Sequence, residues 1–143
     1  SHDGYTLEKW SVGSTKGITL REFDNYNYGI SNKTKHSYNY GLYVDMDDNI
    51  YLSDMIYHYV LKFSPEQNSA TIVAGIMNGN GSGLHQLNEP GQIYVDNFGN
   101  IYIADSLNHR IQKWTPGAKQ GITVAGGNGQ GSQPNQLNTP QGV

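Results

Sequence analysis

Residues 92–114, QIYVDNFGNIYIADSLNHRIQKW, contain three short apolar runs separated by two polar turns. β-branched and aromatic residues fill these runs, and such residues fit a half-buried, pleated surface. Residues 97–100 (NFGN) lie between the first two runs and have the Asn and Gly of a tight hairpin turn. Residues 106–109 (SLNH) separate the second run from the third and are expected to form a loop. The stretch therefore predicts three consecutive antiparallel strands.

The same pattern occurs 51 residues earlier, over residues 41–63, GLYVDMDDNIYLSDMIYHYVLKF. Core and turn positions coincide without a gap, and the register continues into the VAG triplets at 73–75 and 124–126. These triplets add a fourth strand to each copy. A repeat of this period with four strands per unit is typical of a solenoid or a propeller.

Partial copies flank the two complete ones. Residues 7–10 and 17–20 match residues 111–114 and 121–124, and residues 137–143 repeat residues 87–93. We therefore expect a single repeat segment over 1–143, divided into 1–36, 37–86, 87–136 and 137–143. Both ends fall inside a unit, which predicts a window from a longer chain. The alternative is a short chain that self-associates, because repeat units bury their faces only against neighbours.

The run VDNFGNIYIADSLNHRIQKW, followed by ITVAGG and LNTPQGV, resembles the NHL repeat. The resemblance is clear over residues 41–143 and weaker over 7–20. NHL repeats build β-propellers, usually of six blades. The resemblance implies an all-β fold, a partial β-propeller of four-stranded antiparallel NHL-type blades, with two complete blades and two partial ones. The second unit departs from the pattern, with Tyr57 and Tyr59 where the third has Asn108 and Arg110.

The composition narrows the classes of function. A net charge of −3 gives no overall basic field, so nucleic acid is not expected as the main partner. No apolar run of about 18 residues is present, so we expect a soluble chain without membrane insertion. The chain has no cysteine, which excludes disulfides and thiolate metal sites but leaves the compartment open.

Residues 21–40 replace the Gly-rich connectors found between the other units and are rich in Tyr and Asn. Tyr26, Tyr28, Tyr38 and Tyr40 alternate with Asn, which suits an adaptable contact surface. Alternatively, these tyrosines cap the edge of a blade interface.

In a propeller, the loops joining the second and third strands share one face with the connectors between blades. This arrangement brings His58 and His109 to one face, where imidazoles are able to bind zinc. The alternative is that each packs or hydrogen-bonds beside its own loop. We predict no cofactor and no metal site; if a metal binds, His58 and His109 are the residues that would hold it.

Two acidic positions are assigned local roles. Asp54 and Asp105 end their second strands, where a carboxylate accepts amide hydrogens from the following loop, and Asp105 is also able to pair with Arg110. Residues 45–49 begin like a calcium loop, but Ile50 and Ile56 stand where glycine and glutamate are needed. Residues 45–49 are therefore predicted to be a hairpin turn.

The leading hypothesis is a non-catalytic propeller scaffold that binds a protein through its loop face, since no catalytic motif is present. The predicted binding residues are Tyr26, Tyr28, Tyr38, Tyr40, Tyr57, Asn108, His109 and Arg110. The resemblance also implies two alternatives. One is a metal-dependent lyase of the peptide-amidating type that uses His58 and His109. The other is a single-stranded RNA-binding propeller with Lys33, Lys35 and Arg110 on its basic face.

Overall fold

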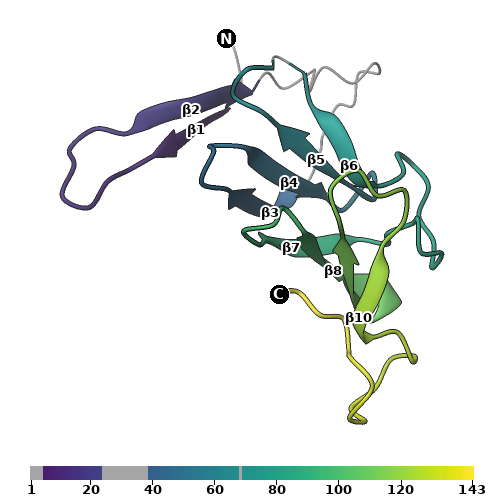
Figure 1. The fold of residues 1–143 in the computed structure, drawn as a ribbon. Coiled ribbons are helices and arrows are strands. Elements are labelled where there is room, and N and C mark those ends of the chain that lie inside the picture. Colours follow the sequence, from purple (N-terminus) through teal and green to yellow (C-terminus); the bar gives the residue numbers. More distant parts are fainter. Residues whose placement is uncertain (1–4, 24–38, 68) are drawn as a thin grey trace.

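A computed structural model describes residues 5–23, 39–67 and 69–143 of the chain (Figure 1). Within these residues the protein consists of ten strands and one short 3-10 helix. The first six strands are β1 (Tyr5–Lys9), β2 (Ile18–Phe23), β3 (Asn39–Val44), β4 (Ile50–Asp54), β5 (Tyr59–Phe63) and β6 (Thr71–Gly75). The others are β7 (Pro90–Val95), β8 (Ile101–Asp105), η1 (Ser106–Asn108), β9 (Arg110–Trp114) and β10 (Ile122–Gly126).

The strands form three antiparallel sheets in chain order. Strands β3 to β6 make one four-stranded sheet and β7 to β10 make another, each with sequential neighbours paired. Strands β1 and β2 form a separate hairpin that projects from the body of the molecule (Figure 1). The prediction of an all-β partial propeller built from four-stranded antiparallel blades is confirmed. The expected loop at 106–109 differs, because it contains the single 3-10 turn η1.

The two four-stranded sheets pack face to face, with β7 against β3 and β4. Their shared core contains residues from both sheets, as the alternation of side chains across a strand requires. Its buried members are Tyr51, Val60, Ala74, Leu87, Ile93, Val95, Ile101, Ile103 and Trp114. Burial of large side chains here is the main stabilising contribution, since truncating one such residue to alanine costs about 2–5 kcal/mol.

A second core lies on the opposite side of the β3–β6 sheet. It contains Ile50, Leu52, Tyr59, Leu61 and Phe63. Leu7 of β1 and Leu20 of β2 pack against it, so the hairpin contacts this face of the sheet through these two side chains. Consecutive residues of β4 therefore point to different cores, because Tyr51 faces one sheet and Leu52 faces the hairpin.

The turns at 45–49 and 96–100 are built alike. Asp45 accepts amide hydrogens from Asp47 and Asn49 on Oδ1, and Asp96 accepts those of Phe98 and Asn100 in the same way. The residue with positive φ is Asp48 (58°) in the first turn and Gly99 (79°) in the second. The carboxylate of Asp45 is thus held by its own turn, which confirms the prediction of a hairpin turn at 45–49. Across the described ranges, no helix is both long and apolar enough to traverse a membrane.

Candidate functional site

Loops from both four-stranded sheets gather at one end of the structure, where they meet the connector of residues 76–89. The backbone N–H of Leu107 donates to the Asn88 carbonyl (3.1 Å), and that of Asn78 donates to the Tyr57 carbonyl (3.1 Å). We call the surface formed by residues 55–58, 76–89 and 106–109 the loop face. It contains the predicted binding residues Tyr57, Asn108 and His109, whereas Arg110 begins β9 and lies buried beneath it.

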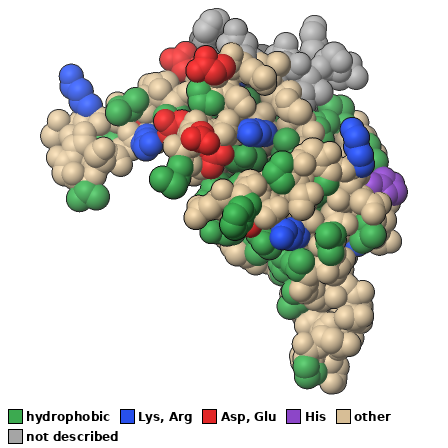
Figure 2. All heavy atoms as spheres, viewed as in Figure 1, with side chains coloured by type: hydrophobic (Ala, Val, Ile, Leu, Met, Phe, Trp, Pro, Cys, Tyr) green, Lys and Arg blue, Asp and Glu red, His purple; other side chains and the backbone are tan. Residues whose placement is uncertain are grey.

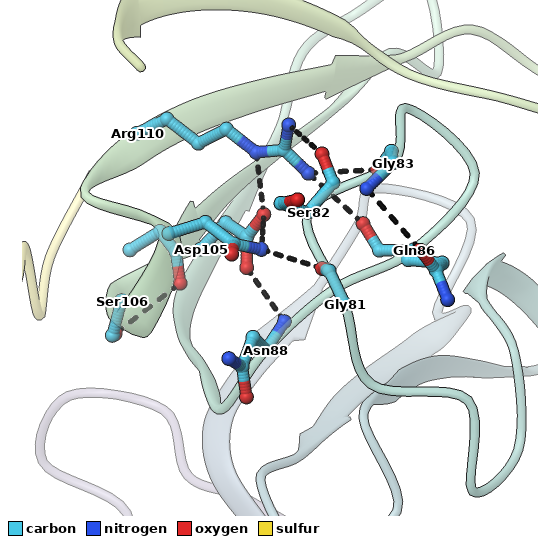
Figure 3. A network of polar contacts seen from close by, with 10 residues as sticks. Gly81, Ser82, Gly83, Gln86, Asn88, Asp105, Ser106 and Arg110 are labelled. Carbon is cyan, nitrogen blue, oxygen red and sulfur yellow. Dashed lines mark hydrogen bonds and ion pairs between the residues drawn. The ribbon is translucent and has the colours of Figure 1, made fainter. Parts of the chain in front are cut away.

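Asp105 is the centre of a hydrogen-bond network beneath this face (Figure 3). Its Oδ2 accepts from Nε of Arg110 (2.7 Å) and from Nδ2 of Asn108 (2.9 Å). Its Oδ1 accepts from the backbone N–H of Asn88 (2.7 Å). The predicted pairing with Arg110 is confirmed, but the backbone donor belongs to the connector and not to the following loop. Burial raises the pKa of the Asp105 carboxyl, although the bonds from Asn108, Asn88 and Arg110 act in the opposite direction.

Arg110 holds the connector by donating hydrogen bonds to the connector's carbonyl oxygens. Its Nη1 donates to Ser82 (2.9 Å), and its Nη2 donates to Gly83 (2.9 Å) and Gln86 (3.1 Å) (Figure 3). Asn108 adds a further bond to the Gly81 carbonyl (2.8 Å). Arg110 is only 5% exposed. Its guanidinium is therefore placed to fix the connector under the surface, and a ligand in solvent would not reach it easily.

The equivalent carboxylate in the other sheet, Asp54, is satisfied differently. Its Oδ1 accepts from the backbone N–H groups of Ile56 and Tyr57 (both 2.9 Å), as predicted. Its Oδ2 is buried and has no partner, and burial raises the pKa of this carboxyl. Tyr57 and Tyr59, which stand where the third unit has Asn108 and Arg110, stack on each other with centroids 6.1 Å apart.

His58 and His109 make matching contacts. Nδ1 of His58 accepts the N–H of Glu89, and Nδ1 of His109 accepts the N–H of Thr139, both at 3.1 Å. The imidazole of each histidine thus bonds to a connector about 30 residues further along the chain, whereas the backbone N–H of each bonds locally, to Asp54 and Ser106. Both have positive φ, 62° and 51°. Burial lowers the pKa of His58, whereas the charges of Glu89, Asp54 and Asp105 raise it.

The sequence reasoning missed two apolar residues at the tips of the loop face. Ile56 is 47% exposed and Leu107 is 42% exposed. They occupy equivalent positions, 51 residues apart, in the loops 55–58 (MIYH) and 106–109 (SLNH). The signal that would have found them is this recurrence of an apolar residue at the same loop position in both copies.

Other predicted residues lie outside what the structure describes. Tyr26, Tyr28 and Tyr38 fall in the undescribed range 24–38, as do Lys33 and Lys35. Tyr40 belongs to β3, but its side chain is not described. The contact role of the tyrosine-rich connector remains a prediction.

The histidines do not fit a metal site in the part of the chain that the structure describes. No three His, Cys, Asp or Glu side chains come together there as a ligand set. Nδ1 of both His58 and His109 is also committed to a backbone N–H. These two residues therefore serve as supports for the connectors.

Comparison with known proteins agrees with this architecture. Residues 87–114 match the family model of the NHL repeat. Over 81 residues the chain is 32% identical to peptidyl-alpha-hydroxyglycine alpha-amidating lyase 2 of Drosophila melanogaster, covering 56% of this chain and 20% of that relative. The chain thus spans about a fifth of that curated relative.

Solved structures from Bacteroides thetaiotaomicron share the fold. An auxiliary nutrient binding protein aligns over 99% of this chain and 37% of its own, with a TM-score of 0.59 and 16% identity. A protein of unknown function aligns over 96% and 36%, with a TM-score of 0.65 and 20% identity. Residues 87–114 thus carry an NHL repeat, and the fold of the chain is that of a partial β-propeller.

Proposed function

We propose that this chain is a non-catalytic NHL-repeat propeller scaffold that binds a protein partner through its loop face. The observation that carries the proposal is the exposure of Ile56 and Leu107 at equivalent loop tips. Exposed apolar side chains on a loop face suit the centre of a protein interface, where they become desolvated.

The polar groups beside these tips support the same reading. Hydrogen bonds from Asn108 and Arg110 to carbonyl oxygens of the connector fix the connector backbone beneath the surface. Asp105 holds the Arg110 guanidinium in place. A face whose loops are fixed in advance loses less entropy when a partner binds. Arg110 thus contributes by holding the face in shape, while Tyr57 and the tyrosines at 26, 28, 38 and 40 extend the proposed contact surface.

Affinity capture with matched variants tests the proposal. The double variant Ile56→Ser/Leu107→Ser removes both apolar tips, and Phe98→Ser removes a still more exposed apolar side chain from the opposite end of the sheets. We expect a protein captured by the wild type and by Phe98→Ser to be lost, by about tenfold or more, with the double variant. Equal capture by all three proteins would refute the proposal.

A second candidate rests on the similarity to the Drosophila amidating lyase. It is a metal-dependent lyase of the peptide-amidating type, in which His58 and His109 would have to release the connector N–H groups that their Nδ1 atoms accept in order to bind the metal. Titration with Zn²⁺ followed by calorimetry distinguishes it from the scaffold. Stoichiometric zinc uptake that is lost in His58→Asn/His109→Asn would favour the lyase, and absence of uptake would remove this candidate.

A further inference from the structure

A groove runs between the two four-stranded sheets at the end opposite the loop face. We call this end the turn face and define it by the turns at 45–49, 96–100 and 115–117. The inner part of the groove has a volume of about 220 Å³ and lies between the first two of these turns. The outer part, of about 150 Å³, lies between Tyr51 and Lys62 of one sheet and the turn at 115–117 of the other. Both walls thus come from complete sheets, whose packing shapes the groove.

The two parts of the groove adjoin each other. Tyr51 lines the outer part and donates its hydroxyl to Oδ2 of Asp45 (3.3 Å), which lines the inner part. Gly99 lines both parts. Pockets for small molecules typically have about 300–1,000 Å³, so each part alone is too small for a drug-sized ligand. An extended peptide that places one side chain in each part fits the groove better.

Apolar side chains line the groove along its length. Met46 is 95% exposed and lines the inner part together with Tyr43 and Val95. Val73 and Pro116 line the outer part. Removing the exposed methionine from water favours association, and its unbranched side chain adapts to the shape of a partner. The inner part is therefore able to hold an apolar side chain against Met46.

The two parts of the groove carry opposite charges. Asp45, Asp47 and Asp96 line the inner part, and Lys62 lines the outer part. Within the ranges that the structure describes, none of these four side chains takes part in an ion pair. Figure 2 shows acidic side chains gathered over the β3–β4 turn, with hydrophobic side chains beside them. A complementary ligand is therefore positive at the inner part and negative at the outer part.

From the shape, the apolar walls and the charges of this groove we infer that the turn face docks an extended segment of a partner protein. A lysine or arginine of the segment lies among the three aspartates, and a neighbouring apolar side chain packs on Met46. A carboxylate further along the segment reaches Lys62. Nucleic acid is disfavoured, because its phosphates would meet the aspartates. The docking is separate from partner binding at the loop face, which lies at the other end of the sheets.

Selection from a phage-displayed library of random peptides tests the inference, with the 143-residue chain as bait. Peptides of about 12 residues span roughly 40 Å when extended, which is ample for both parts of the groove. We expect the enriched sequences to combine a basic residue, an apolar neighbour and an acidic residue further along. No enrichment, or enriched sequences that lack a basic residue, would overturn the inference.

Fluorescence polarisation with one enriched peptide then measures the effect of variants. Asp47→Arg reverses a charge at the inner part but keeps the hydrogen bonds of the turns, which other aspartates accept. Met46→Ser removes the exposed apolar side chain. We expect each to weaken binding by about tenfold or more. The control Ile56→Ser/Leu107→Ser changes only the loop face and should bind the peptide like the wild type.

The outer part of the groove has a matched pair of lysines. Lys62 lines the groove, whereas Lys113 is the equivalent residue of the other sheet and does not line it. Each lysine lies over a tyrosine ring of its own sheet, at 5.5 and 5.6 Å from the ring centroid. Lys62→Gln should weaken binding of the peptide, and Lys113→Gln should not. Equal effects of the two variants would overturn the assignment of the outer part.

Replacing the basic residue of the peptide by glutamine locates that residue in the groove. The replacement should weaken binding to the wild type but have little further effect on Asp47→Arg, because a charge contact removed on one side cannot be lost again on the other. Equal effects on both proteins would place the basic residue elsewhere and overturn the inference. Binding that is unchanged by Met46→Ser would also overturn it, since charge alone would then account for the association.

Discussion

Asp105 and Asp54 occupy the same position in two successive blades, yet their neighbourhoods are chemically different. Asp105 is met by a guanidinium and an amide, whereas Asp54 has only backbone donors and one unpartnered oxygen. Desolvating a carboxylate is expensive unless it is paired, and burial raises the pKa of both. In the third unit the network thus holds the connector at 81–86, because Arg110 donates to the carbonyl oxygens of Ser82 and Gly83.

Arg110→Ala should destabilise the fold strongly, because it leaves the fully buried Asp105 without its counter-charge. Breaking one side of a buried pair costs about 3–5 kcal/mol. Urea unfolding followed by fluorescence measures the change in the free energy of unfolding. Lys113→Ala, which removes a cation from the surface of the same strand, should change it by less than about 1 kcal/mol. If Arg110→Ala lowered the free energy of unfolding by that little, the pair with Asp105 would not stabilise the fold.

Stability should fall as the pH drops through the range where free histidine titrates. Burial lowers the pKa of His58, so the unfolded chain binds the proton more readily than the folded one. Stability from His58 is therefore present above its ordinary pKa of about 6.5 and is lost as pH falls through the lower, folded value. Protonation also removes the acceptor used by the Glu89 N–H.

Thermal unfolding of the wild type and of His58→Asn between about pH 5 and pH 8 checks this expectation. Asparagine tolerates the positive φ at position 58 and offers an acceptor, but it does not titrate. We expect the pH slope to be shallower in the variant. Identical slopes would exclude His58 as the titrating group.

At the scale of single residues, the sequence predicted contacts that are close along the chain. The pairing of Asp105 with Arg110 and the capping of residues 56–57 by Asp54 were predicted from local spacing. The bonds from Arg110 to Ser82 and Gly83 span 27 to 28 residues. Glycine-rich connectors have no periodic pattern, so no sequence signal fixes which carbonyl will lie beneath the guanidinium.

At the scale of elements, the ends of the outer strands depend on glycine. Gly75 ends β6 with φ of 78°, and an added Cβ would collide with the carbonyl of His58. A Cβ added at Gly126 would collide in the same way with the carbonyl of His109. Both glycines therefore allow the strand to approach the histidine that holds the next connector.

Gly75→Ala tests this close approach. Gly117 has a similar φ of 74° but open space around it, so Gly117→Ala reports the backbone strain alone. That strain is about 1–2 kcal/mol, and overpacking adds roughly 1–3 kcal/mol at Gly75. Chemical denaturation should show Gly75→Ala to be the less stable variant by that difference. Equal losses would mean that the strand end relaxes without cost.

The element pattern was largely predictable because alternation and turn residues act locally. The strands of both complete blades and the turn at 45–49 follow from β-branched runs and Asp, Asn and Gly positions. The 3-10 turn η1 could not be predicted from the sequence, since three residues are too few to show a helical period. Its counterpart at 55–58 has a similar spacing but forms only a turn.

At the scale of the molecule, stability is unevenly distributed. The two four-stranded sheets share an extensive apolar core, with several side chains that are fully buried. The β1–β2 hairpin contributes Leu7 and Leu20 to the second core. An exposed ion pair between Lys9 and Asp48 (2.9 Å) and a bond from Arg21 to the Gln67 carbonyl (3.1 Å) add to its attachment. Exposed pairs of this kind contribute little.

Amide hydrogen exchange should therefore be faster in the hairpin than in the two four-stranded sheets. Amides of β1 and β2 should exchange through local opening, faster than those of β8 and β9, which open only when the shared core does. Mass spectrometry of the 143-residue chain measures the exchange rates of both groups of amides. Protection of β1 and β2 equal to that of β8 would contradict this view, because the hairpin would then belong to the same cooperative unit as the two sheets.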